Sequence, residues 1–120
     1  MGLTHVTASI RGLSGSDAQY EAEFLVDTRT TDCFAPADQL RAAGVVEAGR
    51  RVYELANGAL LEYAYGFARI AFFGSETVTP VIFGPDGTEP LLGVIALEGT
   101  GIGVDPTTKS LKRMAAIPLK

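Results

Sequence analysis

The sequence predicts an all-β, barrel-like domain with one or two short helices, and three observations lead to this prediction. Short runs in which apolar and polar residues alternate recur along the chain, as they do in half-buried strands. The 14 glycines and 6 prolines fall mostly between these runs, where they are expected to form turns. Only two segments, both short, have the composition of a helix. At 120 residues the chain is predicted to form a single domain, residues 1–120.

The first two strands are expected at residues 6–10 and 20–26. In both segments apolar residues alternate with Thr, Ser, Glu or Arg, which gives each strand one buried and one exposed face. The segment between them, residues 12–17, is rich in Gly and Ser and is predicted to turn. The resulting hairpin would deliver Asp27 at its end.

The middle of the chain is expected to contain a short helix and a second hairpin. Residues 36–44 begin with Pro and end with Gly, which are common at the two ends of a helix. A strand is predicted at residues 51–55, and the Asn57-Gly58 pair that follows is a strong hairpin signal because both residues tolerate positive φ.

Residues 60–73 form the longest predicted strand, and both of its faces are apolar. We expect the aromatic face, Tyr63, Tyr65 and Phe67, to pack in the core, because aromatics at this spacing usually pack rather than bind. Gly66, on the other face, is a candidate for a bend or bulge.

The last third of the chain is expected to alternate between strands and turns or loops. Residues 77–83 are predicted to return as a strand, and residues 84–90 form a Gly/Pro-rich loop. The apolar run at residues 91–98 is expected to be a strand end that passes into one or two helical turns. Residues 102–105 and 110–115 are predicted to form a last hairpin.

Composition and charge exclude several classes of function. With 10 basic and 14 acidic residues the net charge is −4, which argues against nucleic acid or an anionic membrane as partner. The single cysteine, Cys33, excludes an internal disulfide and is expected to be buried, and a single histidine, His5, leaves no zinc cluster. We therefore expect no metal and no cofactor. No targeting signal or membrane-spanning run is recognised, so the chain is expected to be cytoplasmic.

The segment from Phe24 to Asp32 is the strongest candidate for a functional site. Three apolar residues run directly into Asp27, and hydroxyl residues follow. A carboxylate at the end of a buried strand is costly unless hydrogen bonds or another charge compensate it, and such acids are over-represented at functional sites. The same pattern also fits a simple turn residue. We expect the second acid, Asp32, to cap the following helix or to pair with Arg29.

Several short motifs follow one another along the chain, from about residue 19 to residue 113. They are Phe24-Leu-Val-Asp-Thr, Pro36, Leu55-Ala-Asn-Gly, Phe83-Gly-Pro-Asp-Gly, Pro90-Leu-Leu-Gly and Val104-Asp-Pro. In this order and at these spacings they resemble the retropepsin-like aspartic proteases, and in particular the small bacterial proteins of that clan. The resemblance implies a closed β-barrel, the half-domain of the acid proteases.

The resemblance also implies a mechanism and a partner. In that family two chains form a homodimer, and each chain gives one aspartate, here Asp27, to a dyad that activates a water to cleave an extended peptide. Thr28 matches the threonine that hydrogen-bonds across the dimer axis. Asn57 and Gly58 match the tip of the flap that covers the peptide. Residues 91–93 match a segment that packs under the catalytic loop.

The chain departs from the family next to the catalytic acid. Arg29 stands where the family has glycine, and Thr30 stands at the usual alanine, both at positions that contact the substrate. Glycine lets a peptide backbone approach closely, whereas an arginine adds bulk and favours the ionised state of both carboxylates. Two functions remain open: an active aspartic endopeptidase, and an impaired relative that binds extended peptides without cutting them. A dimeric scaffold with an empty cleft is a third.

Overall fold

The computed structural model describes residues 4–15 and 17–116. Residues 1–3, 16 and 117–120 lie outside the described residues, and they include Ser16 of the predicted turn. The described residues contain nine strands and two short helices, which confirms the prediction of an all-β fold with few helices. Their order is β1 (His5–Arg11), β2 (Tyr20–Val26), β3 (Cys33–Pro36), α1 (Ala37–Ala42), β4 (Glu47–Glu54), β5 (Leu60–Phe72), β6 (Ser75–Gly84), β7 (Leu91–Leu92), α2 (Val94–Thr100), β8 (Ile102–Val104) and β9 (Leu111–Arg113).

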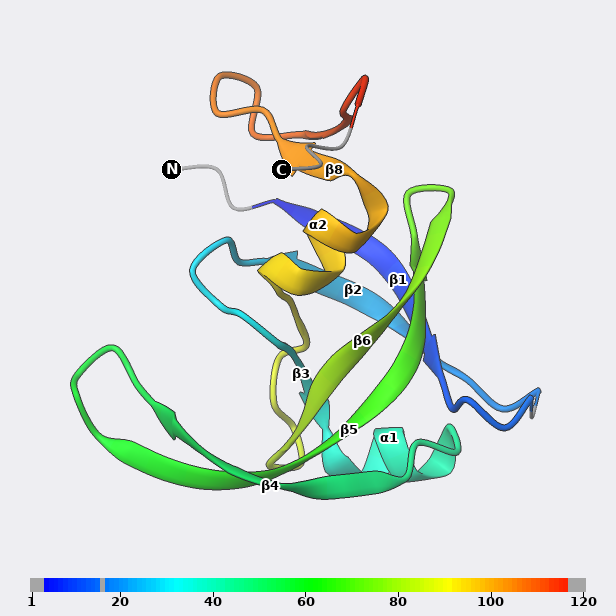
Figure 1. Ribbon diagram of the computed structural model, residues 1–120, viewed down its shortest axis with the longest axis vertical. Helices are drawn as coiled ribbons and strands as arrows, with labels where there is room; N and C mark the ends of the chain where they lie inside the picture. Colours follow the sequence, from blue (N-terminus) through cyan, green and yellow to red (C-terminus); the bar gives the residue numbers. More distant parts are fainter. Residues whose placement is uncertain (1–3, 16, 117–120) are drawn as a thin grey trace.

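Six strands close into a barrel (Figure 1). Their order is β1-β2-β7-β3-β6-β5, and antiparallel pairing of β1 with β5, from Ala8 opposite Phe72 to Arg11 opposite Arg69, closes the ring. Strand β4 lies outside the ring and pairs only with β5. The last hairpin, β8–β9, forms a separate two-stranded sheet, as the sequence predicts.

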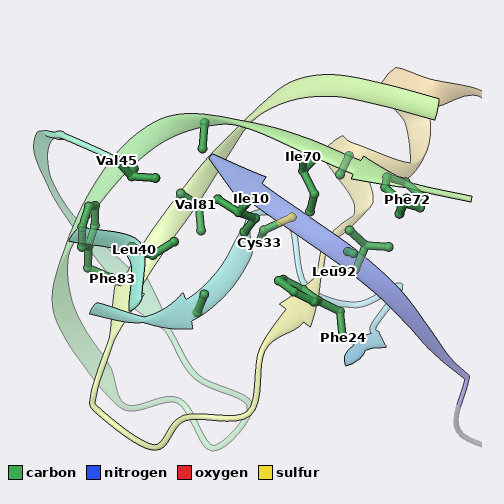
Figure 2. Packing of buried hydrophobic residues seen from close by; sticks show 14 of the residues in the cluster. Ile10, Phe24, Cys33, Leu40, Val45, Ile70, Phe72, Val81, Phe83 and Leu92 are labelled. Atoms are coloured by element: carbon green, nitrogen blue, oxygen red, sulfur yellow. The ribbon is translucent and has the colours of Figure 1, made fainter. Parts of the chain in front are cut away.

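The interior of the barrel is filled by side chains that alternate along the strands (Figure 2). Strands β1 and β2 pair as the predicted hairpin, and Ile10 and Phe24 on their inner face are fully buried. Burying a side chain of this size contributes about 1.5–3 kcal/mol. The largest fully buried side chains are Phe24, Ile10, Leu40, Ile70, Leu92 and Ile102.

One prediction for β5 is wrong, because the face that enters the core is the one with small residues. Tyr63 and Tyr65 are half-buried and Phe67 is 41% exposed. A Cβ on Gly66 would lie 2.4 Å from the carbonyl oxygen of Val46, so the strands approach too closely there for a large side chain. A bulge in β4 lies opposite Gly66, in agreement with the predicted irregularity. The buried face consists of Ala64, Gly66, Ala68, Ile70 and Phe72.

The turns follow the predicted positions, with one difference in geometry. The Asn57-Gly58 hairpin forms between β4 and β5, but of these two residues only Gly58 has a positive φ, +88°. The Asn57 side-chain oxygen instead accepts a hydrogen bond from the Ala59 amide at 2.9 Å. The turn with two positive φ values is Phe73-Gly74, between β5 and β6.

Both helices lie at the predicted places. Helix α1 starts after Pro36 and ends before Gly44, whose φ of +87° suits a helix end. The run at residues 91–98 becomes the short strand β7 followed by α2. Within the part of the chain that the structure describes, neither helix has the length and apolar character needed to cross a membrane.

Candidate functional site

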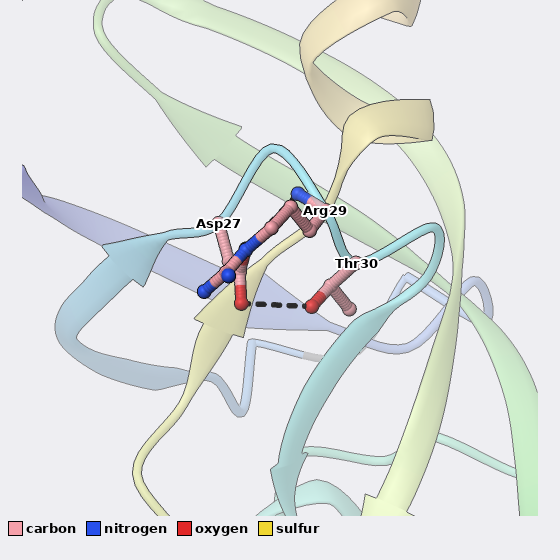
Figure 3. Close-up of polar contacts among 3 residues, drawn as sticks. All are labelled: Asp27, Arg29 and Thr30. Carbon is pink, nitrogen blue, oxygen red and sulfur yellow. Dashed lines mark hydrogen bonds and ion pairs between the residues drawn. The ribbon is translucent and has the colours of Figure 1, made fainter. Parts of the chain in front are cut away.

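Asp27 lies immediately after β2, where the chain leaves the barrel wall. Its backbone amide donates to the Leu92 carbonyl oxygen at 3.1 Å, which fixes the residue against β7. Each oxygen of its carboxylate accepts one hydrogen bond. Oδ1 accepts from the Arg29 amide at 3.0 Å. Oδ2 accepts from the Thr30 hydroxyl at 3.0 Å, the bond drawn as a dashed line in Figure 3. The side chain is 21% exposed. The hydrogen bonds compensate this partial burial and set the orientation of the carboxylate.

The Arg29 side chain lies across this carboxylate (Figure 3). Its guanidinium Nε is 3.6 Å from Asp27 Oδ1, which is an ion pair but too long for a hydrogen bond. The side chain is 93% exposed. The guanidinium is therefore in solvent on its outer side, and the backbone amide of Arg29 holds Asp27 more closely than its charge does.

The segment after β7 supports the loop at residues 27–32 from behind. The Val94 amide donates to the Thr30 carbonyl oxygen at 2.8 Å, and the Ile95 amide donates to the Thr31 carbonyl oxygen at 3.1 Å. A Cβ on Gly93 would lie 2.5 Å from the Asp32 carbonyl oxygen, so only glycine fits at this contact. Residues 91–93 thus pack against the loop at residues 27–32, as the resemblance to the retropepsin-like proteases implies.

A cleft of about 670 Å³ opens beside Asp27, between the loop at residues 27–32 and the β4–β5 hairpin. Its polar lining includes Asp27, Arg29 and Thr30. Its apolar lining includes Phe34, Tyr53, Leu55, Tyr63, Ile82 and Leu91. A mostly apolar cleft with a few polar groups at one place is typical of a ligand site.

The structure brings together some of the predicted site residues and not others. Asp27, Arg29 and Thr30 line the cleft. Thr28 is exposed beside it, and its hydroxyl has no hydrogen-bond partner among residues 4–15 and 17–116. Asn57 and Gly58 lie at the exposed tip of the hairpin and do not line the cleft, because the tip extends past it.

Asp32 makes neither of the predicted contacts. Asp32 is only 4% exposed, and its Oδ2 accepts a hydrogen bond from the Tyr53 hydroxyl at 3.1 Å. The Arg51 guanidinium lies 3.9 Å from the same oxygen. The chain turns inward toward the buried Cys33, which carries Asp32 away from Arg29 and from the start of α1. Burial and the charge of Asp32 raise the pKa of Tyr53 to about 12.

Sequence reasoning missed the residues that line the cleft from the hairpin side. Tyr53 and Leu55 stand two residues apart, so a strand places them on one face, and this signal was available in the sequence. The sequence spacing does not indicate that Phe34 and Tyr63 line the cleft, because the two residues lie on different strands. Their rings meet edge-on at 5.6 Å because β3 and β5 are brought together by the barrel.

Cys33 is fully buried, as predicted. The Gly93 amide lies 3.5 Å from its sulfur, and burial raises the pKa of the thiol to about 11. Burial thus favours the protonated thiol at neutral pH and disfavours the nucleophilic thiolate. No group of three or more His, Cys, Asp or Glu side chains suited to a metal ion occurs in the part of the chain that the structure describes.

The arrangement offers one oriented carboxylate at the edge of a cleft of about 670 Å³. No protein-family model and no curated protein matches this chain.

Proposed function

We propose that this protein is a homodimeric aspartic endopeptidase of the retropepsin type, in which Asp27 is the acid that each chain contributes. The observation that carries the proposal is the Asp27 carboxylate, which is held by the Arg29 amide and the Thr30 hydroxyl beside a cleft of about 670 Å³. These two donors leave lone pairs free on both oxygens, so the carboxylate can still bind a water and a second carboxylate.

The second carboxylate would come from a second copy of the chain. Asp27 contacts Arg29, Thr30 and Leu92, and no acid among the described residues shares its hydrogen bonds. A twofold dimer is the commonest way to bring two identical groups together. The exposed Thr28 hydroxyl beside Asp27 would be available for a hydrogen bond across the axis.

In such a dimer the two carboxylates share one proton, because like charges at hydrogen-bond distance do not both ionise. The ionised Asp27 takes a proton from a water, whose oxygen forms a bond to the peptide carbonyl carbon. The protonated Asp27 of the second copy gives its proton to the carbonyl oxygen. When the tetrahedral intermediate collapses, the C–N bond breaks and the leaving nitrogen takes the proton that the first Asp27 received from the water. One hydroxyl of the intermediate gives its proton to the second Asp27, so the dyad again holds one proton.

A second candidate function is supported by Arg29. Its guanidinium lies over Asp27 at 3.6 Å, where it narrows the approach to the carboxylate. This favours a module that holds an extended peptide in the cleft without cutting it. We rank it second because the side chain is 93% exposed and exposed ion pairs are weak, so a peptide can displace it at little cost.

The proposal is tested by incubating the purified chain with unstructured peptides from pH 3 to 7, with sedimentation to measure the oligomeric state. The peptidase predicts a dimer and cleavage that Asp27→Asn reduces by about 10²–10⁴-fold. Asp86→Asn, in the exposed loop before β7, is the matched control and should cut normally. The binding module instead predicts peptide affinity, without cleavage, that survives Asp27→Asn. A wild-type chain and an Arg29→Gly variant that both leave all peptides intact would exclude the peptidase.

A further inference from the structure

The hairpin beside the cleft is a two-stranded arm, which we define as residues 51–63. Strand β4 pairs only with β5, and the pairing of β5 with β6 begins at Tyr65. Residues 51–63 therefore extend beyond the barrel, and Figure 1 shows the hairpin projecting away from the other strands. A two-stranded hairpin is only marginally stable by itself. The position of the arm over the cleft depends on side-chain contacts.

Among the described residues, a single side-chain hydrogen bond joins the arm to the loop that carries Asp27, and it runs from Tyr53 to Asp32. The Tyr53 hydroxyl donates to Asp32 Oδ2 at 3.1 Å, in a part-buried setting. Two weaker contacts support it: Arg51 Nη1 is 3.9 Å from the same oxygen, and the Tyr63 ring packs edge-on against Phe34.

Asp32 Oδ2, the acceptor of this hydrogen bond, has no ready substitute for the Tyr53 hydroxyl as its donor. The Asp32 side chain is 5% exposed, and Oδ2 has no other hydrogen-bond donor among the described residues. A buried carboxylate without donors is costly, so opening the arm exposes Asp32 to an energetic penalty until water enters. The hydrogen bond therefore favours one position of the arm.

Asp32 also links the arm to Asp27, because it bonds to Tyr53 and lies in the same loop as Asp27. Both acids belong to the loop at residues 27–32, whose carbonyl groups at Thr30 and Thr31 are held by α2. The Tyr53 hydroxyl also remains a hydrogen-bond donor at neutral and acidic pH. Burial and the charge of Asp32 raise the pKa of Tyr53 to about 12, so its hydroxyl keeps its proton across the neutral and acidic range.

We propose that Tyr53 is a positioning residue whose hydrogen bond to Asp32 holds the arm over the cleft, and whose release opens the cleft for a ligand. A hairpin that covers the peptide is what the family resemblance already implies, and the new element is the hydrogen bond that fixes its closed position. Its role as a cover for a peptide rests on the proposed function, whereas its attachment to Asp32 does not.

Hydrogen exchange of the backbone amides tests the attachment without any substrate. Tyr53→Phe removes only the hydroxyl and keeps the ring, so the fold is retained. We expect exchange in residues 54–60 to accelerate by about tenfold, as for the loss of a hydrogen bond to a charged acceptor. Tyr63→Phe is the matched control: it lies in the same arm, its hydroxyl has no partner among the described residues, and its exchange should equal that of the wild type.

Two results would overturn the proposal. Equal exchange in Tyr53→Phe and Tyr63→Phe would show that the hydrogen bond does not hold the arm. Faster exchange throughout the barrel in Tyr53→Phe would show that the bond stabilises the whole fold and not the arm. Because neither result depends on cleavage, a failure here is distinct from a failure of the proposed peptidase. With any peptide that binds, Tyr53→Phe should also raise the dissociation rate by a similar factor, whereas Tyr63→Phe should not.

Discussion

The Arg29 guanidinium lies over the carboxylate of Asp27, with Nε 3.6 Å from Oδ1, while 93% of the Arg29 side chain remains exposed. The backbone of Arg29 and its side chain therefore act on the same acid in different ways. The amide donates a hydrogen bond to Oδ1 at 3.0 Å and orients it, as any residue except proline would. The side chain adds a positive charge and bulk on the side from which a ligand arrives.

The first prediction concerns this side chain. Arg29→Gly keeps the amide that orients Asp27 and removes the bulk above it, so a peptide backbone can approach more closely. For an active enzyme we expect kcat/KM to rise by about 10- to 100-fold, since small misplacements of a substrate cost about that much. A fluorogenic peptide assay measures it. Arg69→Ala, an exposed arginine on β5 outside the cleft, should leave kcat/KM unchanged. An unchanged or lower rate in Arg29→Gly would mean that the side chain does not obstruct the site.

The second prediction concerns the tip of the arm. Gly58 has a φ of +88°, a left-handed conformation that costs a residue with a Cβ about 1–2 kcal/mol. Gly58→Ala should therefore accelerate amide exchange in residues 55–60. Gly58→Asn should have a smaller effect, because asparagine tolerates positive φ. Equal effects of alanine and asparagine would contradict the conformational explanation.

The third prediction concerns the support behind the loop at residues 27–32. A Cβ on Gly93 would lie 2.5 Å and 2.6 Å from the carbonyl oxygens of Asp32 and Thr31. Because both contacts are to backbone, Gly93→Ala should lower the free energy of unfolding by about 1–3 kcal/mol, the usual cost of overpacking. Urea denaturation measures it. Gly103→Ala is the control, since a Cβ there would meet no atom within 4 Å and φ is not positive. A Gly93→Ala variant as stable as Gly103→Ala would show that the loop at residues 27–32 moves aside without a cost in stability.

Much of this fold could be predicted because its signals are local. The alternation in β1 and β2, the glycine that ends α1 and the Asn57-Gly58 turn each depend on residues that are neighbours in the sequence. The change from β7 to α2 was predicted from one apolar run for the same reason.

The errors arose where the outcome depends on distant partners. Both faces of β5 are apolar, so the face that enters the core depends on how β5 pairs with distant strands, β1, β4 and β6. The contact of Asp32 with Tyr53 joins residues 21 positions apart, and it depends on the register between β4 and β5. Asp27, which the sequence singles out as the candidate catalytic acid, lines the cleft.

The fourth prediction concerns the thiol behind the loop. Burial raises the pKa of Cys33 from 9.0 to about 11, and its sulfur is fully enclosed by the core. Between these values the unfolded chain loses the thiol proton and the folded chain keeps it, so the unfolded state binds fewer protons. Stability must therefore fall as pH rises through this window, by up to about 1.4 kcal/mol per pH unit from this group.

Cys33→Ala isolates this contribution. Tyr20 and Tyr53, whose pKa values are also raised, titrate in both proteins and cancel in the comparison. The free energy of unfolding in urea, measured from pH 8 to 10.5 under reducing conditions, should fall more steeply for the wild type than for Cys33→Ala. Parallel curves would mean that the thiol ionises at the same pH in the folded and unfolded chains, and that water reaches the sulfur in spite of its burial. Slow labelling of Cys33 by a thiol reagent at pH 8, set against rapid labelling in denaturant, would show independently that the loop and α2 keep it enclosed.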